Sequence, residues 1–455
     1  MSSPFRFVCA VSLVSLLTAC GPRESPPASQ ETSSSPQPAM DNPSGTGPSE
    51  EEALVARARD IHDRVITIDT HVDINTSNFT ADNNYTSDLD VQVNLPKMEA
   101  GGLDVAWFIV YTGQDELTEE GFAAAYDNAM DKFGAIHRLA DEYAPDRIEV
   151  AYNSDDVRRI AAEGKKVAMI GVENGYPLAM ELDRVQAFHE MGARYMSLTH
   201  NGHNQLGDSN TGERDDVWMH DGLSELGREV VREMNRLGMM IDLSHPSIQT
   251  NLQSMELSEA PVIASHSSAR ALAPSVSRNL TDEELLMLAE SGGVVQAVAF
   301  RSYLDPEKHE RNREALRALQ EEIAEEIGLV LLDNDELNEL NGPQREEYDE
   351  QFARLEELAA PRIEAEVDAI APPVDVADLV DHIDYMVELI GIDHVGITSD
   401  FDGGGGVEGW MNASETFNVT LELVRRGYTE EEIAKLWGEN LLRVLDEVQA
   451  VAESM

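Results

Sequence analysis

Residues 68–73 read Ile-Asp-Thr-His-Val-Asp, a short strand-like segment that closes with a histidine and an aspartate two positions apart. In an extended segment, residues i and i+2 point to the same side, so His71 and Asp73 can reach a single metal ion. An isolated pair of this kind is more often structural than functional. Its meaning therefore depends on what closes the other extended segments of the chain.

Short apolar, β-branched runs recur along the chain, and longer amphipathic segments separate them. Near-continuous apolar strands that alternate with helices predict a parallel sheet covered on both faces. Eight such units in one chain predict an α/β fold, a closed (β/α)8 barrel of the TIM type. The expected strands are residues 65–71, 104–110, 167–173, 194–200, 238–245, 261–266, 293–299 and 394–400.

Ionisable residues close six of these eight expected strands. In a barrel, the carboxyl ends of the strands meet at one mouth, where active sites form. Six such endings in register are hard to obtain by chance. The side chains offer only nitrogen and oxygen donors, which suits zinc, and manganese or cobalt fit the same set. The residues are His71, Asp73, Glu173, His200, His245, His266 and Asp400.

The number of candidate ligands predicts the number of metal ions. His71, Asp73, Glu173, His245 and His266 exceed what one tetrahedral ion uses, but they suffice for two ions bridged by a carboxylate. Two ions roughly 3.5–4 Å apart acidify a shared water and polarise a carbonyl at neutral pH. Hydrolysis of an amide or an ester is the expected chemistry.

Residues 305–371 interrupt the alternation between the seventh expected strand and the helix before the eighth. They contain 21 acidic and 7 basic residues. Apolar residues recur there at helical spacing, as at Ala315, Leu316, Leu319 and Ile323, so we expect a helical insertion on the side of the barrel mouth. Three roles stay open for it: a lid, a dimer contact, or a solvated excursion without a role.

The composition excludes some classes of function. The chain has 455 residues, with 33 Lys and Arg against 86 Asp and Glu, a formal net charge of -53. So acidic a surface repels phosphates and argues against nucleic-acid binding. Both cysteines, Cys9 and Cys20, lie near the N-terminus, so the body of the chain has no disulfide and no thiolate site. Any metal must be held by His, Asp and Glu.

The first twenty residues are typical of a bacterial export signal, with Arg6 before an apolar stretch at 7–17. Residues 17–20, Leu-Thr-Ala-Cys, resemble a lipobox, in which Cys20 becomes the lipidated first residue; an ordinary cleaved signal peptide is the alternative. Gly21 favours the outer membrane. We therefore expect a lipoprotein of the bacterial cell envelope that faces the periplasm, with contact to the membrane only through Cys20.

The chain is expected to have three parts. Residues 1–20 form the lipoprotein signal peptide. Residues 21–52 hold seven Pro and seven Ser with few apolar residues, which is typical of a flexible tether. Residues 53–450 form a single catalytic domain that includes the insertion at 305–371.

Six strings in this chain resemble, in order, the metal and catalytic motifs of the membrane (renal) dipeptidase family, metallopeptidase family M19. The resemblance runs from about residue 65 to 445 and implies an amidohydrolase-like, metal-dependent hydrolase barrel. The strings are DTHVD (69–73), GVENG (171–175), LTHN (198–201), DLSH (242–245), SHSSA (265–269) and SDFDG (399–403).

The resemblance implies a role for each ligand. His71, Asp73 and a bridging Glu173 would hold one zinc ion, while Glu173, His245 and His266 would hold the other. Mn²⁺ or Co²⁺ could replace zinc. A hydroxide activated by the two metals would attack the peptide bond.

The resemblance also implies roles at the substrate. Asp400 would be the general acid and base that passes the proton to the leaving amine. His200 would stabilise the developing oxyanion. Arg278 would bind the free C-terminal carboxylate of the substrate. Arg270 is the competing choice for that contact.

A metal-dependent dipeptidase is thus the leading hypothesis, acting on small dipeptides that include ones with a D-residue at the C-terminal side. The resemblance is compatible with a homodimer. A first rival is an amidohydrolase acting on lactones or cyclic amides. Such enzymes commonly bridge their metals with a carboxylated lysine. The rival is disfavoured because Glu173, and no lysine, closes the third strand. A second rival is a non-catalytic, peptide-binding envelope lipoprotein. It is disfavoured because no ligand is missing.

Overall fold

The computed structural model describes residues 49–455, so the predicted export signal, Cys20 and most of the predicted tether lie outside the described residues. The first helix, α1 (Glu50–His62), begins at Ser49, whose side chain accepts the Glu52 N–H while the Glu52 carboxylate accepts the Ser49 N–H. This capping box satisfies two N–H groups at the helix start. Residues 50–52, in the range predicted as tether, are therefore helical.

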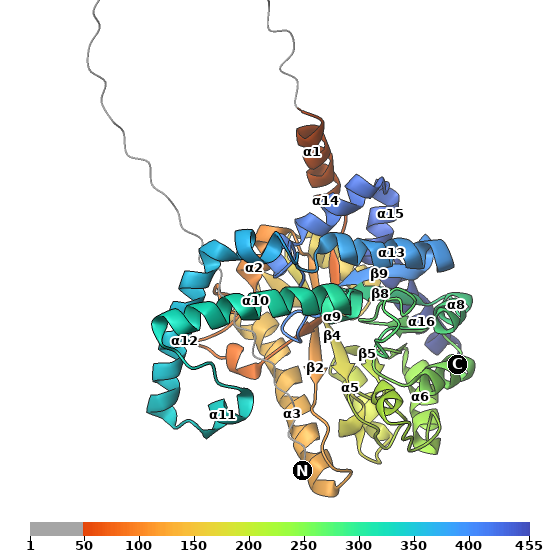
Figure 1. Ribbon diagram of the computed structural model, residues 1–455. Helices are drawn as coiled ribbons and strands as arrows, with labels where there is room; N and C mark the ends of the chain where they lie inside the picture. Colours follow the sequence, from red (N-terminus) through yellow and green to blue (C-terminus); the bar gives the residue numbers. More distant parts are fainter. Residues whose placement is uncertain (1–48) are drawn as a thin grey trace, which may run out of the picture.

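A ring of eight parallel strands forms the centre of the molecule (Figure 1), in the order β1-β2-β4-β5-β6-β7-β8-β9. The ring closes between its first and last members, where the Asp73 N–H donates to the Phe401 carbonyl at 2.9 Å. The predicted α/β barrel of the TIM type is confirmed. The strands are β1 (Ile68–Asp73), β2 (Val105–Tyr111), β4 (Lys166–Glu173), β5 (Ala193–Ser197), β6 (Met240–Asp242), β7 (Ile263–Ala264), β8 (Val294–Val298) and β9 (Val395–Thr398).

All eight expected strands are present, but several end before the ionisable residue that was expected to close them. His245 and Asp400 have φ angles of 81° and 58°, in the left-handed region, which takes the backbone out of the strand ladder. The expected strand at 238–245 therefore shortens to Met240–Asp242. An additional strand, β3 (Ile148–Val150), pairs with the lower part of β4 that β5 does not reach.

Large inward-facing side chains fill the barrel below the mouth. The Trp107 and Tyr195 rings stack with their centroids 5.0 Å apart, and both are fully buried. Gly171 on β4 makes room for them, because a Cβ there would lie 2.2 Å from the Tyr195 ring. The barrel is thus a packed core whose upper surface supports the strand ends.

Helices surround the ring, and their starts carry the sequence signals expected of them (Figure 1). Thr281 and Glu284 form the capping box that starts α8, as their spacing predicts. In the described part of the chain, no helix is both long and apolar enough to cross a bilayer. The helices are α2 (Leu95–Gly101), α3 (Glu119–Arg138), α4 (Ser154–Ala162), α5 (Asp183–Glu190), α6 (Glu225–Leu237), α7 (Ile248–Leu257), α8 (Asp282–Glu290), α13 (Val376–Ile390), α14 (Phe417–Arg426), α15 (Glu430–Ala434) and α16 (Asn440–Ser454).

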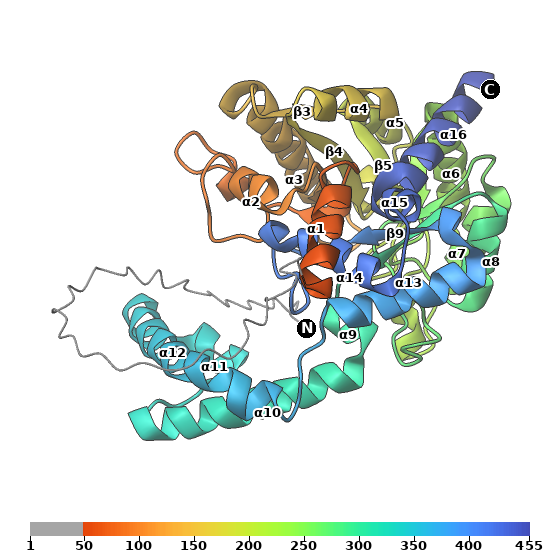
Figure 2. The same cartoon turned by 90° about the horizontal axis from the view of Figure 1, so that it is seen from above.

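The acidic segment after β8 is helical. It comprises α9 (Arg301–Leu304), α10 (Pro306–Ile327), α11 (Asn334–Glu339) and α12 (Gly342–Ile363). Figure 2 shows α10, α11 and α12 as an arm beside the barrel. The arm has a small core of its own, and its base is tied to α13 by the ion pair between Lys308 Nζ and Asp378 Oδ2 at 2.6 Å.

Candidate metal centre

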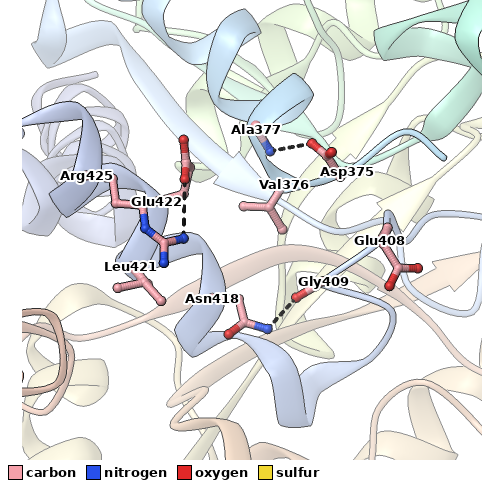
Figure 3. A pocket seen from close by; sticks show the side chains of 9 residues that line it. All are labelled: Asp375, Val376, Ala377, Glu408, Gly409, Asn418, Leu421, Glu422 and Arg425. Carbon is pink, nitrogen blue, oxygen red and sulfur yellow. Dashed lines mark hydrogen bonds and ion pairs between the residues drawn. The ribbon is translucent and has the colours of Figure 1, made fainter. Parts of the chain in front are cut away.

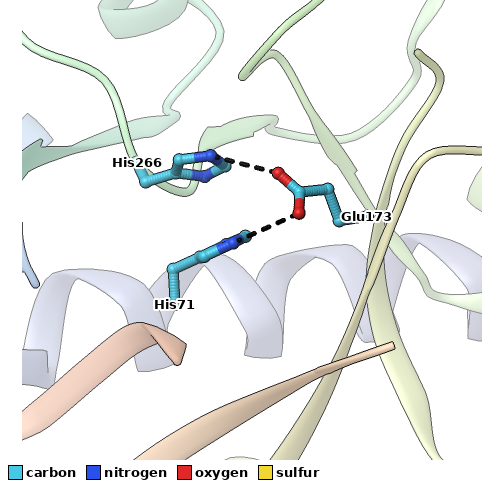
Figure 4. A group of neighbouring side chains, drawn as sticks. All are labelled: His71, Glu173 and His266. Carbon is cyan, nitrogen blue, oxygen red and sulfur yellow. Dashed lines mark ion pairs between the residues drawn. The ribbon is translucent and has the colours of Figure 1, made fainter. Parts of the chain in front are cut away.

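Glu173, the last residue of β4, lies at the centre of the barrel mouth. Its Oε1 is 2.9 Å from His245 Nε2 and 3.3 Å from His266 Nε2, whereas its Oε2 is 3.6 Å from His71 Nε2. Figure 4 shows the His71 and His266 rings approaching different oxygens of this carboxylate. Glu173 therefore lies between His71 of β1 on one side and His245 and His266, which follow β6 and β7, on the other.

Two further carboxylates lie on the His71 side of the cluster. His71 Nε2 is 3.7 Å from Asp73 Oδ2 and 3.9 Å from Asp400 Oδ1. The backbone of Gly403 packs against both, since a Cβ at this position would lie 2.4 Å from each of those two oxygens. His200 completes the set, with its Nε2 3.8 Å from Glu173 Oε1. The structure thus brings together all seven ionisable strand-end residues singled out in the sequence.

Buried hydrogen bonds fix the orientation of two imidazole rings. The Tyr195 hydroxyl donates to the Thr70 carbonyl at 2.9 Å and accepts from His71 Nδ1 at 3.1 Å. The Ser265 hydroxyl donates to Asp242 Oδ2 at 2.6 Å and accepts from His266 Nδ1 at 2.8 Å. In both rings Nδ1 therefore carries a proton, and Nε2 is the atom that faces the cluster.

The donor set fits a divalent cation. His71 Nε2 is buried and has no hydrogen-bond partner among the residues that the structure describes. The Nε2 atoms of His245 and His266 lie only 3.0 Å apart. Burial lowers the pKa of both rings well below the ordinary value, so both are neutral near pH 7. Neutral imidazoles and carboxylates that converge in a buried site are the ligands zinc takes in proteins.

The two central carboxyl groups differ in their protonation. Burial raises the pKa of Asp400 well above its ordinary value, against the opposing effect of His71, and Asp73 and Glu173 raise it further. Burial would also raise the pKa of Glu173, but the surrounding histidines outweigh it and hold that pKa well below its ordinary value. Glu173 is therefore ionised, and Asp400 can hold a proton. Such a divergence between neighbouring carboxyl groups is typical of acid–base sites.

The two candidate arginines differ in what they contact. Arg270 forms a two-fold ion pair with both carboxylate oxygens of Glu213. Arg278 is buried and donates to Ser267 Oγ at 2.9 Å and to the His266 carbonyl at 3.0 Å. Its Nε has no partner within residues 49–455. Within the described part of the chain Arg278 has no carboxylate partner, and it adjoins a proposed ligand of the cluster, whereas Glu213 already neutralises Arg270.

Two supporting residues were missed at the level of sequence. Tyr195 lies inside an apolar strand, and nothing in that pattern separates a core tyrosine from one that holds an imidazole. Ser265 directly precedes His266, but serine is common beside any loop residue. Only the fold reveals that their hydroxyls contact His71 and His266.

A separate cavity of about 300 Å³ lies between the start of α13, the loop at 408–409 and α14 (Figure 3). Its lining contains none of the strand-end residues. Asp375 caps α13 by accepting the Ala377 N–H at 2.8 Å, and Asn418 donates to the Gly409 carbonyl at 2.7 Å. These polar groups stabilise the loop and the helix start, so we do not assign the cavity to catalysis.

Comparison with known proteins gives concordant matches. The sequence pattern of the family described as "Membrane dipeptidase (Peptidase family M19)" matches residues 55–455. Dipeptidase tcpJ of Claviceps purpurea is 31% identical over 377 residues, covering 81% of this chain and 72% of that protein. Dipeptidase aclJ of Aspergillus oryzae is 30% identical over 370 residues, covering 80% of this chain and 72% of that protein.

Solved structures share the fold. The probable dipeptidase PvdM from Pseudomonas aeruginosa superposes with a TM-score of 0.71 at 32% identity, covering 88% of this chain and 99% of that one. A metallopeptidase from Rhodobacter sphaeroides, solved with a phosphinate mimic of L-Ala-D-Ala, has a TM-score of 0.61 at 23% identity. The superposition covers 84% of this chain and 99% of the Rhodobacter protein.

Proposed function

The chain belongs to the membrane dipeptidase family, peptidase family M19, and is a metal-dependent dipeptidase; we propose that it works with two zinc ions held around Glu173. His71, Asp73 and Glu173 would hold one ion, and Glu173, His245 and His266 the other. The observation that carries this proposal is that the two oxygens of Glu173 face different histidines. When bound, such a pair acidifies water and polarises a carbonyl. The histidine-rich set favours zinc over manganese, and cobalt fits as well.

Asp400 is proposed as the group that moves the proton. Its Oδ1 lies within the buried cluster, 3.9 Å from His71 Nε2, and burial raises the pKa of this carboxyl well above its ordinary value. It can take the proton of the attacking water and deliver it to the nitrogen of the leaving amine. A carboxyl whose pKa is raised by burial accepts and returns a proton more readily than an ordinary aspartate.

His200 is proposed to bind the oxygen of the scissile carbonyl. Burial lowers the pKa of its ring, so the imidazole is neutral and Nε2 can carry a hydrogen. Its position at the edge of the cluster, 3.8 Å from Glu173 Oε1, is within reach of a carbonyl bound there. A donor placed in advance at a site of developing charge stabilises the transition state.

Arg278 is proposed to bind the substrate's C-terminal carboxylate, since its guanidinium is buried beside His266 and lacks a carboxylate partner among the described residues. A buried guanidinium and a carboxylate form a strong, directional pair. A longer peptide has no carboxylate at this depth, which accounts for selectivity for dipeptides. We extend the proposal to dipeptides with a D-residue at the C-terminal side, as the family resemblance implies.

The test is a panel of dipeptides with L- and D-residues at each position, assayed on metal-loaded and chelator-stripped protein. We expect hydrolysis that is lost on stripping and restored by zinc, with bound metal approaching two ions per chain. Cleavage of lactones with no cleavage of any dipeptide would overturn the proposal and favour the rival amidohydrolase activity. Metal at one ion per chain in fully active protein would overturn the two-ion arrangement.

The proposed location follows from the sequence outside the described residues. We propose that Cys20 is lipidated and that the barrel faces the periplasm, attached to the outer membrane through the tether. A homodimer is likewise a proposal from the family resemblance, and light scattering of the purified protein measures it.

A further inference from the structure

Lys132 stands out in the buried face of α3. This face repeats at helical spacing through Ala125, Ala129, Phe133 and Ile136, which are all buried core residues. Lys132 lies in the same stripe and is 8% exposed. Lysine is seldom so deeply buried without a partner, because removing an ammonium from water is costly.

The Lys132 ammonium lacks the partner that every other lysine has. The remaining five of the six lysines in the chain each form an ion pair with a carboxylate. Within residues 49–455 no hydrogen bond or ion pair involves the Lys132 ammonium, in a chain that has 86 acidic residues. Burial accordingly lowers the pKa of Lys132. The charges of Asp73 and Glu173 raise this pKa and partly offset the effect of burial. Among the described residues the ammonium lies over the face of the Tyr111 ring but pairs with no carboxylate.

The contacts of Lys132 lead to the barrel mouth. Its Nζ lies 5.2 Å from the centroid of the Tyr111 ring, and Tyr111 is the last residue of β2. The Tyr111 ring in turn meets the His200 ring edge-on, with centroids 4.8 Å apart. Asp73 and Glu173, whose charges act on Lys132, belong to the proposed metal centre. Lys132 thus adjoins the wall of the same mouth.

The order of the strands places this wall opposite Arg278. In the eight-membered ring β2 is second and β7, which Arg278 adjoins, is sixth, so the two lie across the mouth from each other. Glu173 pairs with Tyr111 on the neighbouring strand, and its carboxylate reaches to 3.3 Å from His266, which follows β7. A dipeptide with its carboxylate at Arg278 and its peptide bond over Glu173 would therefore extend its N-terminal residue toward Tyr111 and Lys132. This step rests on the proposed function.

We propose that Lys132 is a specificity-determining residue that binds an anionic side chain on the N-terminal residue of the substrate. Asp73 and Glu173 cannot fully neutralise the Lys132 ammonium, because both carboxylates would be ligands of the proposed metal ions. A substrate carboxylate would supply the missing partner. Dipeptides that begin with glutamate or aspartate are therefore the preferred class.

The test compares substrates that differ only in this charge. Glu-Ala and Gln-Ala form one matched pair, Asp-Ala and Asn-Ala the other, and kcat/KM is measured for each with zinc-loaded full-length protein. We expect the acidic member to be preferred by about ten-fold or more, because hydrogen bonds to charged groups are among the stronger ones in proteins. In Lys132→Met the ratio should fall to about one, and Lys132→Arg should retain part of the preference.

Lys166→Met is the matched control, since Lys166 pairs with Asp104 at the opposite end of the barrel. It should keep the parent ratio. A parent protein that cleaves Gln-Ala as fast as Glu-Ala overturns the inference, as does a preference that survives in Lys132→Met. The ratio of kcat/KM between the acidic and the neutral dipeptide in the parent protein tests the inference even if Lys132→Met does not fold. Failure to cleave any of the four dipeptides, acidic or neutral, would instead count against the proposed function itself.

Discussion

Glu173 shows how much of this centre depends on single side chains. Its Oε2 faces His71 and its Oε1 faces His245 and His266. The Nδ1 atoms of His71 and His266 are bonded to hydroxyl groups of the barrel interior. The fold therefore supplies both the ligand and its orientation. Asp400 differs from Glu173 in its pKa. Burial raises the pKa of Asp400, so this carboxyl can hold a proton, whereas Glu173 is ionised.

The first prediction concerns this proton. Asp400→Asn should keep the fold and the bound metal but lower kcat by about 10²–10⁴-fold, the usual contribution of a general acid–base group. Asparagine has nearly the same shape but cannot transfer a proton. Stopped assays give kcat, and elemental analysis with circular dichroism gives metal content and fold. Turnover close to that of the parent would remove Asp400 from the acid–base role.

The second prediction concerns the carboxylate anchor. Arg278→Ala should raise KM for dipeptides and lower kcat/KM by about ten-fold or more, because hydrogen bonds to charged groups are among the stronger ones. Arg270→Ala serves as the control, since its guanidinium is already paired with Glu213. The parent enzyme should also discriminate against dipeptide amides. Equal cleavage of a dipeptide and its amide would contradict the anchor.

The residues of the centre could be predicted from the sequence because each follows an apolar run that the barrel must bury. His71, Glu173 and His266 needed no knowledge of distances, only the rule that strand ends of a barrel meet. The supporting hydroxyls could not be predicted in this way. Tyr195 contacts His71 across 124 positions, a pairing that depends on the register of strands and on the space left by Gly171.

At the scale of elements, the strand ends are where expectation and structure differ. The strands before His245 and Asp400 end early because the backbone turns into the left-handed region at these two residues. Such a conformation costs on the order of 1–3 kcal/mol and persists only where the surroundings impose it. Here the His245 carbonyl accepts the Asn210 side-chain N–H at 2.7 Å. β3 was missed because three residues are too few for a period to appear.

The third prediction tests the link between β6 and β7. Asp242 accepts from the Ser265 N–H and hydroxyl, and that hydroxyl holds His266. Asp242→Asn should weaken zinc binding by about 10–100-fold, the usual effect of losing an outer partner of a ligand. Competition with a chromophoric chelator measures this affinity.

The matched control is Asp69→Asn, which removes an equally buried carboxylate that bonds Thr398 and Ser399 across the β1–β9 closure. This variant should lose stability in urea unfolding with a smaller loss of zinc affinity. Equal affinity losses in the two variants would show that Asp242 acts only through general stability.

The fourth prediction concerns the acidic arm formed by α10, α11 and α12. The arm packs around its own small core, and its two ends meet where Asn312 donates to the Ala371 carbonyl at 2.7 Å. Replacing residues 313–370 by a short Gly-Ser linker should therefore leave the barrel folded and able to bind zinc. Circular dichroism and thermal unfolding check this outcome. Unfolded protein would mean that the arm is part of the barrel core, and an unchanged fold with altered kcat would favour a lid.

For the whole molecule, the net charge bears on the proposed lipid anchor. A net charge of -53 over the whole chain favours solubility and repels anionic surfaces, including membranes rich in acidic lipid. The proposed attachment to a membrane therefore has to come from outside the barrel. Cys20, in the predicted lipobox, is the proposed point of attachment.

The fifth prediction tests that attachment. Several acyl chains on one cysteine, each buried CH₂ contributing about 0.8 kcal/mol, would hold the protein on the membrane despite electrostatic repulsion. Cys20→Ala should therefore move the protein from the membrane fraction to a soluble fraction and abolish labelling by radioactive palmitate. Its specific activity should be that of the parent, because every proposed ligand lies within the barrel. If osmotic shock releases the parent protein without lipid label, Cys20 belongs to an ordinary cleaved signal peptide, and repulsion alone keeps the barrel off the membrane.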